Sequence, residues 1–201
     1  MEIEAFALEL FRIGGVKFGE FTLKSGQKSP VYVDLRGLVS HPAALRAAGE
    51  ALAARARTVE CDCLAGLPYA GLPLAVSASL ASGIPAIYPR KEAKAYGTGQ
   101  RVEGEIRPGQ VAVVIDDVIT TGGAKLELIE PLTAAGLVVR DVVVLIDRQQ
   151  GGAEALREHG LTLHSVFTLP ELLTALRKHD AISPEQFEEV RAYLERSGTA
   201  R

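Results

Sequence analysis

Residues 111–124 read VAVVIDDVITTGGA and set the architecture expected for the whole chain. The first five residues are apolar, which predicts a strand that is buried on both faces and ends at the carboxylates Asp116 and Asp117. The threonines and glycines that follow supply hydroxyls, backbone N–H groups and permissive φ values. A helix predicted over about residues 124–135 adds the partial positive charge of its N-terminus. Together these features predict a loop that binds a phosphate group.

Two patterns that the sequence lacks narrow the kind of phosphate ligand. It contains neither Gly-x-x-x-x-Gly-Lys-Ser/Thr nor Gly-x-Gly-x-x-Gly directly after a strand. Adjacent carboxylates suit a sugar phosphate, because they accept hydrogen bonds from ribose hydroxyls while loop amides hold the 5′-phosphate. The segment resembles the phosphoribosyl-pyrophosphate (PRPP) motif of type I phosphoribosyltransferases. The alternative is a strand and loop without a ligand, which would leave the desolvation cost of two carboxylates uncompensated.

The composition indicates one folded domain with a full core. The chain has 201 residues, 47% of them hydrophobic, and a net charge of −3. No apolar run reaches membrane-spanning length, and the first residues are acidic where a secretory signal would be basic. The negative charge disfavours general nucleic-acid binding. Cys61 and Cys63 are expected to be reduced thiols, with a redox or metal role as the alternative, so the expected location is the cytoplasm.

The N-terminal part of the chain predicts a helix followed by a β-hairpin or small flap. Helical spacing covers residues 4–11, and two short alternating runs lie within residues 18–36. The order Leu-Lys-Ser-Gly, Ser-Pro, an aromatic residue and Asp-Leu-Arg resembles the N-terminal hood of orotate phosphoribosyltransferases, which covers the base. This resemblance implies orotate contacts at Lys24, Tyr32 and Val33, and a PRPP contact at Lys24. Without the resemblance, Lys24 would be interpreted as a solvated charge of the hairpin.

Residues 90–104 read RKEAKAYGTGQRVEG and predict a long mobile loop. Arg90, Lys91 and Lys94 lie within five positions of an acidic protein, close in sequence to where a pyrophosphate would need neutralising. A plain charged loop is the alternative. The run resembles the catalytic loop of orotate phosphoribosyltransferases, which closes over the active site of the neighbouring subunit. The resemblance implies a homodimer, catalysis by Lys94, and PRPP contacts at Arg90, Lys91, Lys94 and Tyr96.

Two further loops follow predicted strands. In related enzymes, a loop such as residues 67–74 touches the pyrophosphate through backbone amides, which implies PRPP contacts at Tyr69 and Ala70; many members carry Lys where this chain has Ala70. A second buried strand is predicted over residues 141–147, and Arg148 follows it. Its planar donor fork suits a carboxylate or an imide, and an ion pair with the preceding aspartate is the alternative. The segment Leu-x-Asp-Arg-x-Gln-Gly-Gly resembles the family's base-recognition turn, in which this arginine contacts orotate.

The resemblance extends over about residues 18–167 and implies an α/β fold of the type I phosphoribosyltransferase kind. Such a fold has a parallel twisted sheet flanked by helices and a small N-terminal hood. We expect a single domain, with the hood mainly in residues 1–36, the core in about 37–170 and C-terminal helices in 170–201. Several stretches are most similar to the transferase half of bifunctional uridine-monophosphate synthases, although 201 residues leave no room for a decarboxylase domain.

The reaction implied by the resemblance makes orotidine 5′-monophosphate and pyrophosphate from orotate and PRPP, as in pyrimidine biosynthesis. Mg²⁺ is the implied cofactor; it would be carried mainly by PRPP and bridged through water to Asp116 and Asp117, without direct protein ligands. The resemblance also implies that these two carboxylates join Lys94 in catalysis and that Thr120 contacts orotate. The implied PRPP site on this stretch comprises Asp116, Asp117, Val118, Ile119, Thr120, Thr121, Gly122, Gly123 and Ala124.

Two other functions remain open on the sequence. One is a phosphoribosyltransferase for a purine base, which Arg148 and Lys24 disfavour because cations suit an anionic base better than a neutral one. The other is a non-catalytic regulator that senses PRPP and binds nucleic acid or a partner. An intact basic loop over residues 90–94 disfavours this regulator, because a sensor has no leaving group to stabilise.

Overall fold

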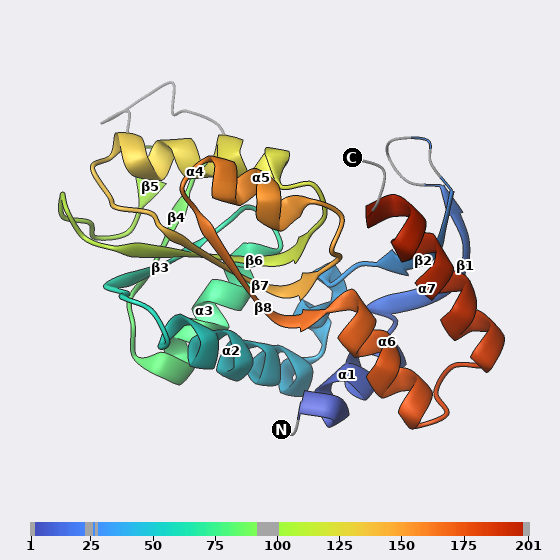
Figure 1. Cartoon of the computed structure of the whole chain (residues 1–201). Helices are drawn as coiled ribbons and strands as arrows, with labels where there is room; N and C mark the ends of the chain where they lie inside the picture. Colours follow the sequence, from blue (N-terminus) through green and yellow to red (C-terminus); the bar gives the residue numbers. More distant parts are fainter. Residues whose placement is uncertain (1–2, 23–25, 27, 92–100, 199–201) are drawn as a thin grey trace.

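A six-stranded sheet forms the centre of the molecule (Figure 1). The computed structural model describes residues 3–22, 26, 28–91 and 101–198. Five strands are parallel, and β5 pairs antiparallel to β4 at one edge. The strand order is β5-β4-β3-β6-β7-β8. The bounds are β3 Cys63–Gly66, β4 Ala86–Pro89, β5 Val102–Glu103, β6 Ala112–Ile119, β7 Asp141–Asp147 and β8 Thr162–Thr168. The predicted α/β fold with a mostly parallel sheet is confirmed.

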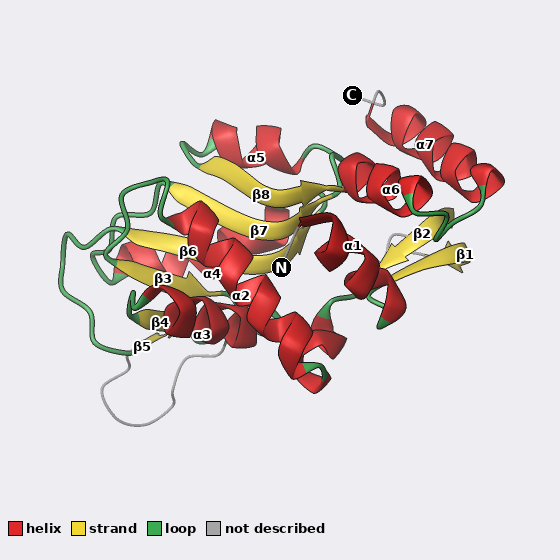
Figure 2. Cartoon of the chain, turned by 90° about the horizontal axis from the view of Figure 1, so that it is seen from below, coloured by secondary structure: helices red, strands yellow, loops and turns green. Residues whose placement is uncertain are grey.

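Helices cover both faces of this sheet, as Figures 1 and 2 show from two directions. One face carries α2 (Pro42–Ala56) and α3 (Gly71–Ser82), and the other carries α4 (Gly123–Ala134) and α5 (Gly152–Glu158). Successive residues of a strand point to opposite faces. Accordingly, Val113 belongs to the core cluster on the α2 side, whereas its neighbour Val114 belongs to the cluster on the α4 side. Burial on both faces explains why the central strands read as continuous apolar runs.

An antiparallel hairpin lies apart from the main sheet, and helices from both ends of the chain surround it (Figures 1 and 2). The C-terminal helix α7 contacts β2, and α1 contacts α6. The bounds are α1 Ile3–Arg12, β1 Val16–Thr22, β2 Lys28–Val33, the 3₁₀ helix η1 Arg36–Ser40, α6 Leu169–Lys178 and α7 Pro184–Gly198. The predicted N-terminal helix and hairpin are confirmed, while the division into hood, core and C-terminal segments stays a prediction. None of the described helices combines the length and apolar character needed to cross a membrane.

One predicted boundary is wrong, and it concerns the acidic pair. The apolar run predicted a strand that ends at the carboxylates Asp116 and Asp117, but β6 continues through both of them to Ile119. The reason is the neighbouring strand: Val118 lies opposite Ile146 of β7, so the ladder extends β6 past the apolar run. Asp116 thus lies within the strand, where its side chain pairs with Lys125 of α4.

Candidate active site

The carboxyl ends of β3 and β6 lie where the strand order reverses. From β3 the chain continues to β4 on one side, whereas β6, β7 and β8 follow on the other. Ligands of open α/β sheets bind at the carboxyl ends of the strands at such a switch point. The loop after β3 begins beside β6, since the N–H of Leu67 donates to the carbonyl of Ile115 at 3.0 Å. The predicted pyrophosphate loop therefore begins beside β6, the strand that leads into the predicted phosphate loop.

The acidic pair is held by short contacts at the end of β6. Asp116 Oδ1 accepts the N–H of Asp117 at 2.9 Å, and its Oδ2 forms an ion pair with Lys125 of α4. Asp117 Oδ1 accepts the N–H of Val118 at 2.8 Å. Burial, reinforced by the negative charge of Asp116, raises the pKa of Asp117 to about 7. The two carboxylates therefore differ in environment, since Asp116 has a buried cation beside it.

The N-terminus of α3 approaches Asp116 closely because Gly71 has no side chain. A Cβ atom at Gly71 would lie 2.5 Å from the carbonyl oxygen of Ile115 and 3.1 Å from Asp116 Oδ1. Such distances leave no room for any other residue without a backbone shift. Glycine at this position therefore brings the loop after β3 and the start of α3 against the acidic pair.

The predicted phosphate loop joins β6 to α4. Gly122, with φ of 81°, precedes the first residue of α4, and no described side chain caps that helix. Its first N–H groups thus point outward without a side-chain acceptor, as in sites that bind anions. Ile119 contributes differently: its side chain is fully buried, and its carbonyl accepts the N–H of Arg148 at 3.1 Å. The loop between β6 and α4 therefore consists of Thr120, Thr121 and Gly122, and Gly123 and Ala124 begin α4.

Arg148 lies directly after β7, and its donors are only partly satisfied. The residue is 5% exposed, and its Nε and Nη2 atoms have no hydrogen-bond partner among the described residues. Burial lowers the pKa of the guanidinium. The ion pair with Asp147 that the sequence allowed is not formed through these atoms; Asp147 Oδ1 accepts the N–H of Gln149 at 2.8 Å. Unpaired buried donors are costly, so this arginine is suited to an anionic ligand.

The other predicted residues fall into two groups. Tyr32 stacks on Phe21 of the hairpin with ring centroids 5.4 Å apart, and Val33 is half-buried against the core. On the other side, the ammonium of Lys91 lies 5.5 Å from the ring centroid of Tyr69, which is 69% exposed. This contact brings the start of the basic segment to the loop after β3. Arg90 pairs with Glu103 at 2.8 Å. Lys24, Lys94 and Tyr96 lie outside the described residues.

The sequence analysis missed Lys125, Gly71 and Tyr193. Tyr193 of α7 is 6% exposed and lies beside the turn after β7, where Gln150 Nε2 reaches its hydroxyl at 3.5 Å. Only Lys125 had a sequence signal, namely a cation in the first turn of the helix after the phosphate loop. The contacts of Gly71 and Tyr193 depend on chain segments that are distant in sequence.

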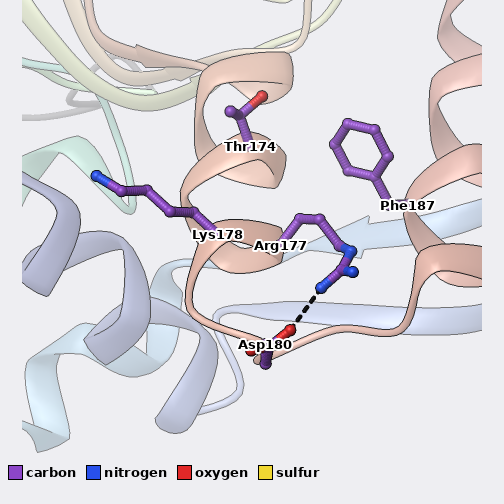
Figure 3. Close-up of a pocket in the computed structure, with 5 residues that line it drawn as sticks. All are labelled: Thr174, Arg177, Lys178, Asp180 and Phe187. Carbon is purple, nitrogen blue, oxygen red and sulfur yellow. Dashed lines mark hydrogen bonds and ion pairs between the residues drawn. The ribbon is translucent and has the colours of Figure 1, made fainter.

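A separate pocket lies between α6 and α7 (Figure 3). Its two cations already have partners: Arg177 donates to Asp180 at 2.6 Å, and Lys178 pairs with Glu4 at 2.7 Å. In Figure 3 the Lys178 side chain points away from Phe187, so the cations do not converge on one point. The lining comes from α6, α7 and the turn between them, and not from strand ends. The switch point of the sheet is therefore the candidate active site.

A parallel sheet with an acidic pair and a phosphate-type loop at its switch point, together with a hairpin at one side, defines the type I phosphoribosyltransferase class. No family model matches the chain. It is 42% identical to the orotate phosphoribosyltransferase of Methanopyrus kandleri over 86% of this chain and 92% of that protein. The chain belongs to the orotate phosphoribosyltransferase family.

Solved structures support the same family. The chain is similar to the structure of Leishmania donovani UMP synthase, with a TM-score of 0.89 and 42% identity over 98% of this chain. A second structure, the orotate phosphoribosyltransferase of Mycobacterium tuberculosis in complex with PRPP, gives a TM-score of 0.70 and 29% identity, covering 85% of this chain and 98% of that one. The chain spans only part of the UMP synthases that it matches: 43% of the Leishmania chain and 39% of the protein from Bos taurus.

Proposed function

We propose that the protein transfers the 5-phosphoribosyl group from PRPP to orotate, giving orotidine 5′-monophosphate and pyrophosphate. The observation that carries this proposal is Arg148, a buried guanidinium with unpaired donors. It follows β7, the direct neighbour of the strand β6 that leads into the phosphate-type loop. A planar fork of donors fits a carboxylate in bidentate fashion, so an anionic base suits this position better than a neutral purine. Family membership supports the same choice of base.

The donor PRPP fits the switch point of the sheet in one orientation. Its 5′-phosphate would lie on the loop from Thr120 to Ala124, and its ribose hydroxyls would meet Asp116 and Asp117. The pyrophosphate would then face the backbone of Tyr69 and Ala70 and the cation of Lys91, which the contact between Lys91 and Tyr69 keeps on that side. Lys94, Arg90 and Tyr96 would act from the same basic segment. Departure of pyrophosphate leaves positive charge on the ribose, which carboxylates at the ring stabilise.

Mg²⁺ would enter this site with the donor. The described residues include no group of three or more His, Cys, Asp or Glu side chains able to hold a metal ion. Mg²⁺ needs few protein ligands, because it prefers phosphate oxygens and retained waters. The donor set of Asp116 and Asp117 fits water-bridged contacts to an ion carried by PRPP. When bound, the ion would neutralise charge on the leaving pyrophosphate.

A homodimer would complete the site by sharing the basic segment between subunits. Helix α3 supports an interface, because it exposes Val76 by 55% and Leu80 by 85% beside a groove lined also by Leu45 and Pro73. Exposed apolar residues in one cluster are typical of contact surfaces.

The cytoplasm would suit the two free cysteines. Burial raises the pKa of the Cys61 and Cys63 thiols to about 11, which keeps both protonated and poorly reactive.

A spectrophotometric assay tests the reaction by following orotate consumption in the presence of PRPP and Mg²⁺. We expect wild type to consume orotate and Lys94→Ala to lose most of the rate while it still binds PRPP. A wild-type protein that binds PRPP but leaves orotate untouched would refute the orotate assignment. The same assay with adenine, guanine and hypoxanthine then separates a purine-base transferase from a PRPP sensor.

A further inference from the structure

Lys125 is a buried lysine in the first turn of α4. It is 7% exposed, and its ammonium contacts Asp116 Oδ2. Lysine is rarely buried unless it is paired. The desolvation cost of a buried ion pair often cancels the attraction between its members, so such a pair is weak evidence for stability. The position of Lys125 therefore calls for an explanation in terms of what it does to Asp116.

Asp116 is fixed at both of its oxygens. Oδ1 accepts the N–H of Asp117 at 2.9 Å, and Oδ2 receives the ammonium of Lys125. The start of α3 also lies close to Oδ1, since a Cβ atom at Gly71 would be 3.1 Å from it. An ionised carboxylate has about four acceptor sites, two on each oxygen. One site on each oxygen thus stays available, which matches two adjacent hydroxyl groups of a ribose.

We propose that Lys125 is a positioning residue of the donor site, which fixes the rotamer of Asp116 and holds a positive charge beside it before the ribosyl donor binds. The inference rests on the proposed function to the extent that Asp116 receives the donor's ribose. A carboxylate that is already oriented and charged stabilises positive charge on the ring without reorganising at the moment of reaction. Lys125 acts through Asp116 and does not touch the base. We therefore expect it to affect donor binding and kcat.

Two substitutions of Lys125 distinguish a positioning role from a packing role. Lys125→Met keeps the length of the side chain and removes its charge, whereas Lys125→Arg keeps the charge. We expect Lys125→Met to lower kcat about tenfold and to raise the Kd for PRPP about fivefold, with the KM for orotate changed less than twofold. Lys125→Arg is expected to stay within threefold of wild type. Lys178→Met is the matched control, because it removes a paired but exposed lysine from α6 and should leave all three constants unchanged.

The double variant Asp116→Asn/Lys125→Met tests whether Lys125 works through Asp116. It also removes both charges together, so it avoids the unpaired buried carboxylate that could unfold Lys125→Met alone. We expect the double variant to match Asp116→Asn within twofold in kcat and in Kd for PRPP. Losses that multiply would overturn the proposal, and so would equal losses in Lys125→Met and Lys125→Arg, which would indicate packing.

Calorimetric titration measures the binding of PRPP directly, so it tests the role of Lys125 separately from the proposed reaction. If wild type binds PRPP without consuming orotate, the proposed reaction fails, while the fivefold change in Kd still decides the role of Lys125. A wild-type protein that does not bind PRPP overturns both proposals. A Lys125→Met protein with the wild-type Kd and kcat overturns the role of Lys125 alone.

Discussion

At the scale of single residues, Arg148 combines a cost in stability with the role in base recognition that we propose for it. Its buried Nε and Nη2 donors have no partner among the described residues, and an unpaired buried donor costs roughly 1–3 kcal/mol. Arg148→Met removes that cost and keeps most of the apolar volume of the side chain. We therefore expect the variant to unfold at a higher temperature than wild type, while kcat/KM for orotate falls at least a hundredfold. Thermal unfolding and steady-state kinetics measure the two effects.

The prediction is specific because the two effects have opposite directions: the unfolding temperature rises while kcat/KM falls. A structural arginine would give a lower unfolding temperature on substitution, and a solvated one would change neither quantity. Arg177→Met serves as the control, because Arg177 is an arginine of α6 paired with Asp180 and should leave the kinetics unchanged. A fall in unfolding temperature for Arg148→Met would contradict the assignment.

The residue Asp117 links stability to pH. Burial raises its pKa from 3.8 to about 7 in the folded protein. Below pH 4 the group is protonated in both states and has no net effect. Between pH 4 and 7 the folded state binds more protons than the unfolded state, so the free energy of unfolding falls as pH rises, and the loss is complete above pH 7. Asp117→Asn should therefore gain on the order of 1–3 kcal/mol relative to wild type between pH 4 and 8.

Chemical denaturation at several pH values checks this expectation. Asn can still accept the N–H of Val118 that Asp117 accepts now, so the substitution isolates the titration. Asp180→Asn, at an exposed position with positive φ that Asn tolerates, provides the control. Parallel curves for wild type and Asp117→Asn across this pH range would show that burial does not perturb Asp117.

At the scale of elements, the approach of α3 to β6 depends on one glycine. A Cβ at position 71 would lie 2.5 Å from the carbonyl oxygen of Ile115, so Gly71→Ala must push the start of α3 away from the acidic pair. We expect a loss of about 1–3 kcal/mol in the free energy of unfolding, together with weaker PRPP binding. Denaturant unfolding and calorimetry measure these losses. Gly37→Ala, where a Cβ would meet nothing within 4 Å, should change neither.

The order and type of the elements could be predicted from sequence because the apolar patterns are strong. The run at residues 111–115 and the hairpin within residues 18–36 have the periods of the strands that they form. The end of β6 could not be predicted, since it depends on pairing with β7 and not on its own polarity. The acidic pair, the phosphate-type loop and Arg148 could be assigned from resemblance. Lys125 could not, because its role arises from a contact between β6 and α4.

At the scale of the whole molecule, the proposed sharing of the basic segment between two subunits predicts that two inactive variants restore activity when they are mixed. If Lys94 acts in the site of the neighbouring subunit, a dimer of one Lys94→Ala protomer and one Arg148→Met protomer carries both defects in the same site. A mixed dimer then contains one site with both residues intact. Random mixing makes half of the dimers mixed, so the pooled protein should recover roughly a quarter of wild-type activity.

The recovery is measured by refolding or co-expressing the two variants and repeating the orotate assay. The exposed apolar residues of α3 supply the control. Adding Leu80→Glu and Val76→Glu to both chains should give monomers in sedimentation analysis, because two charges would be placed on the proposed contact surface. Those monomers should show no recovery on mixing, whereas Val39→Glu, at an exposed apolar position outside α3, should still allow it. Recovery by the monomers, or none by the unmodified pair, would mean that each subunit uses its own basic segment.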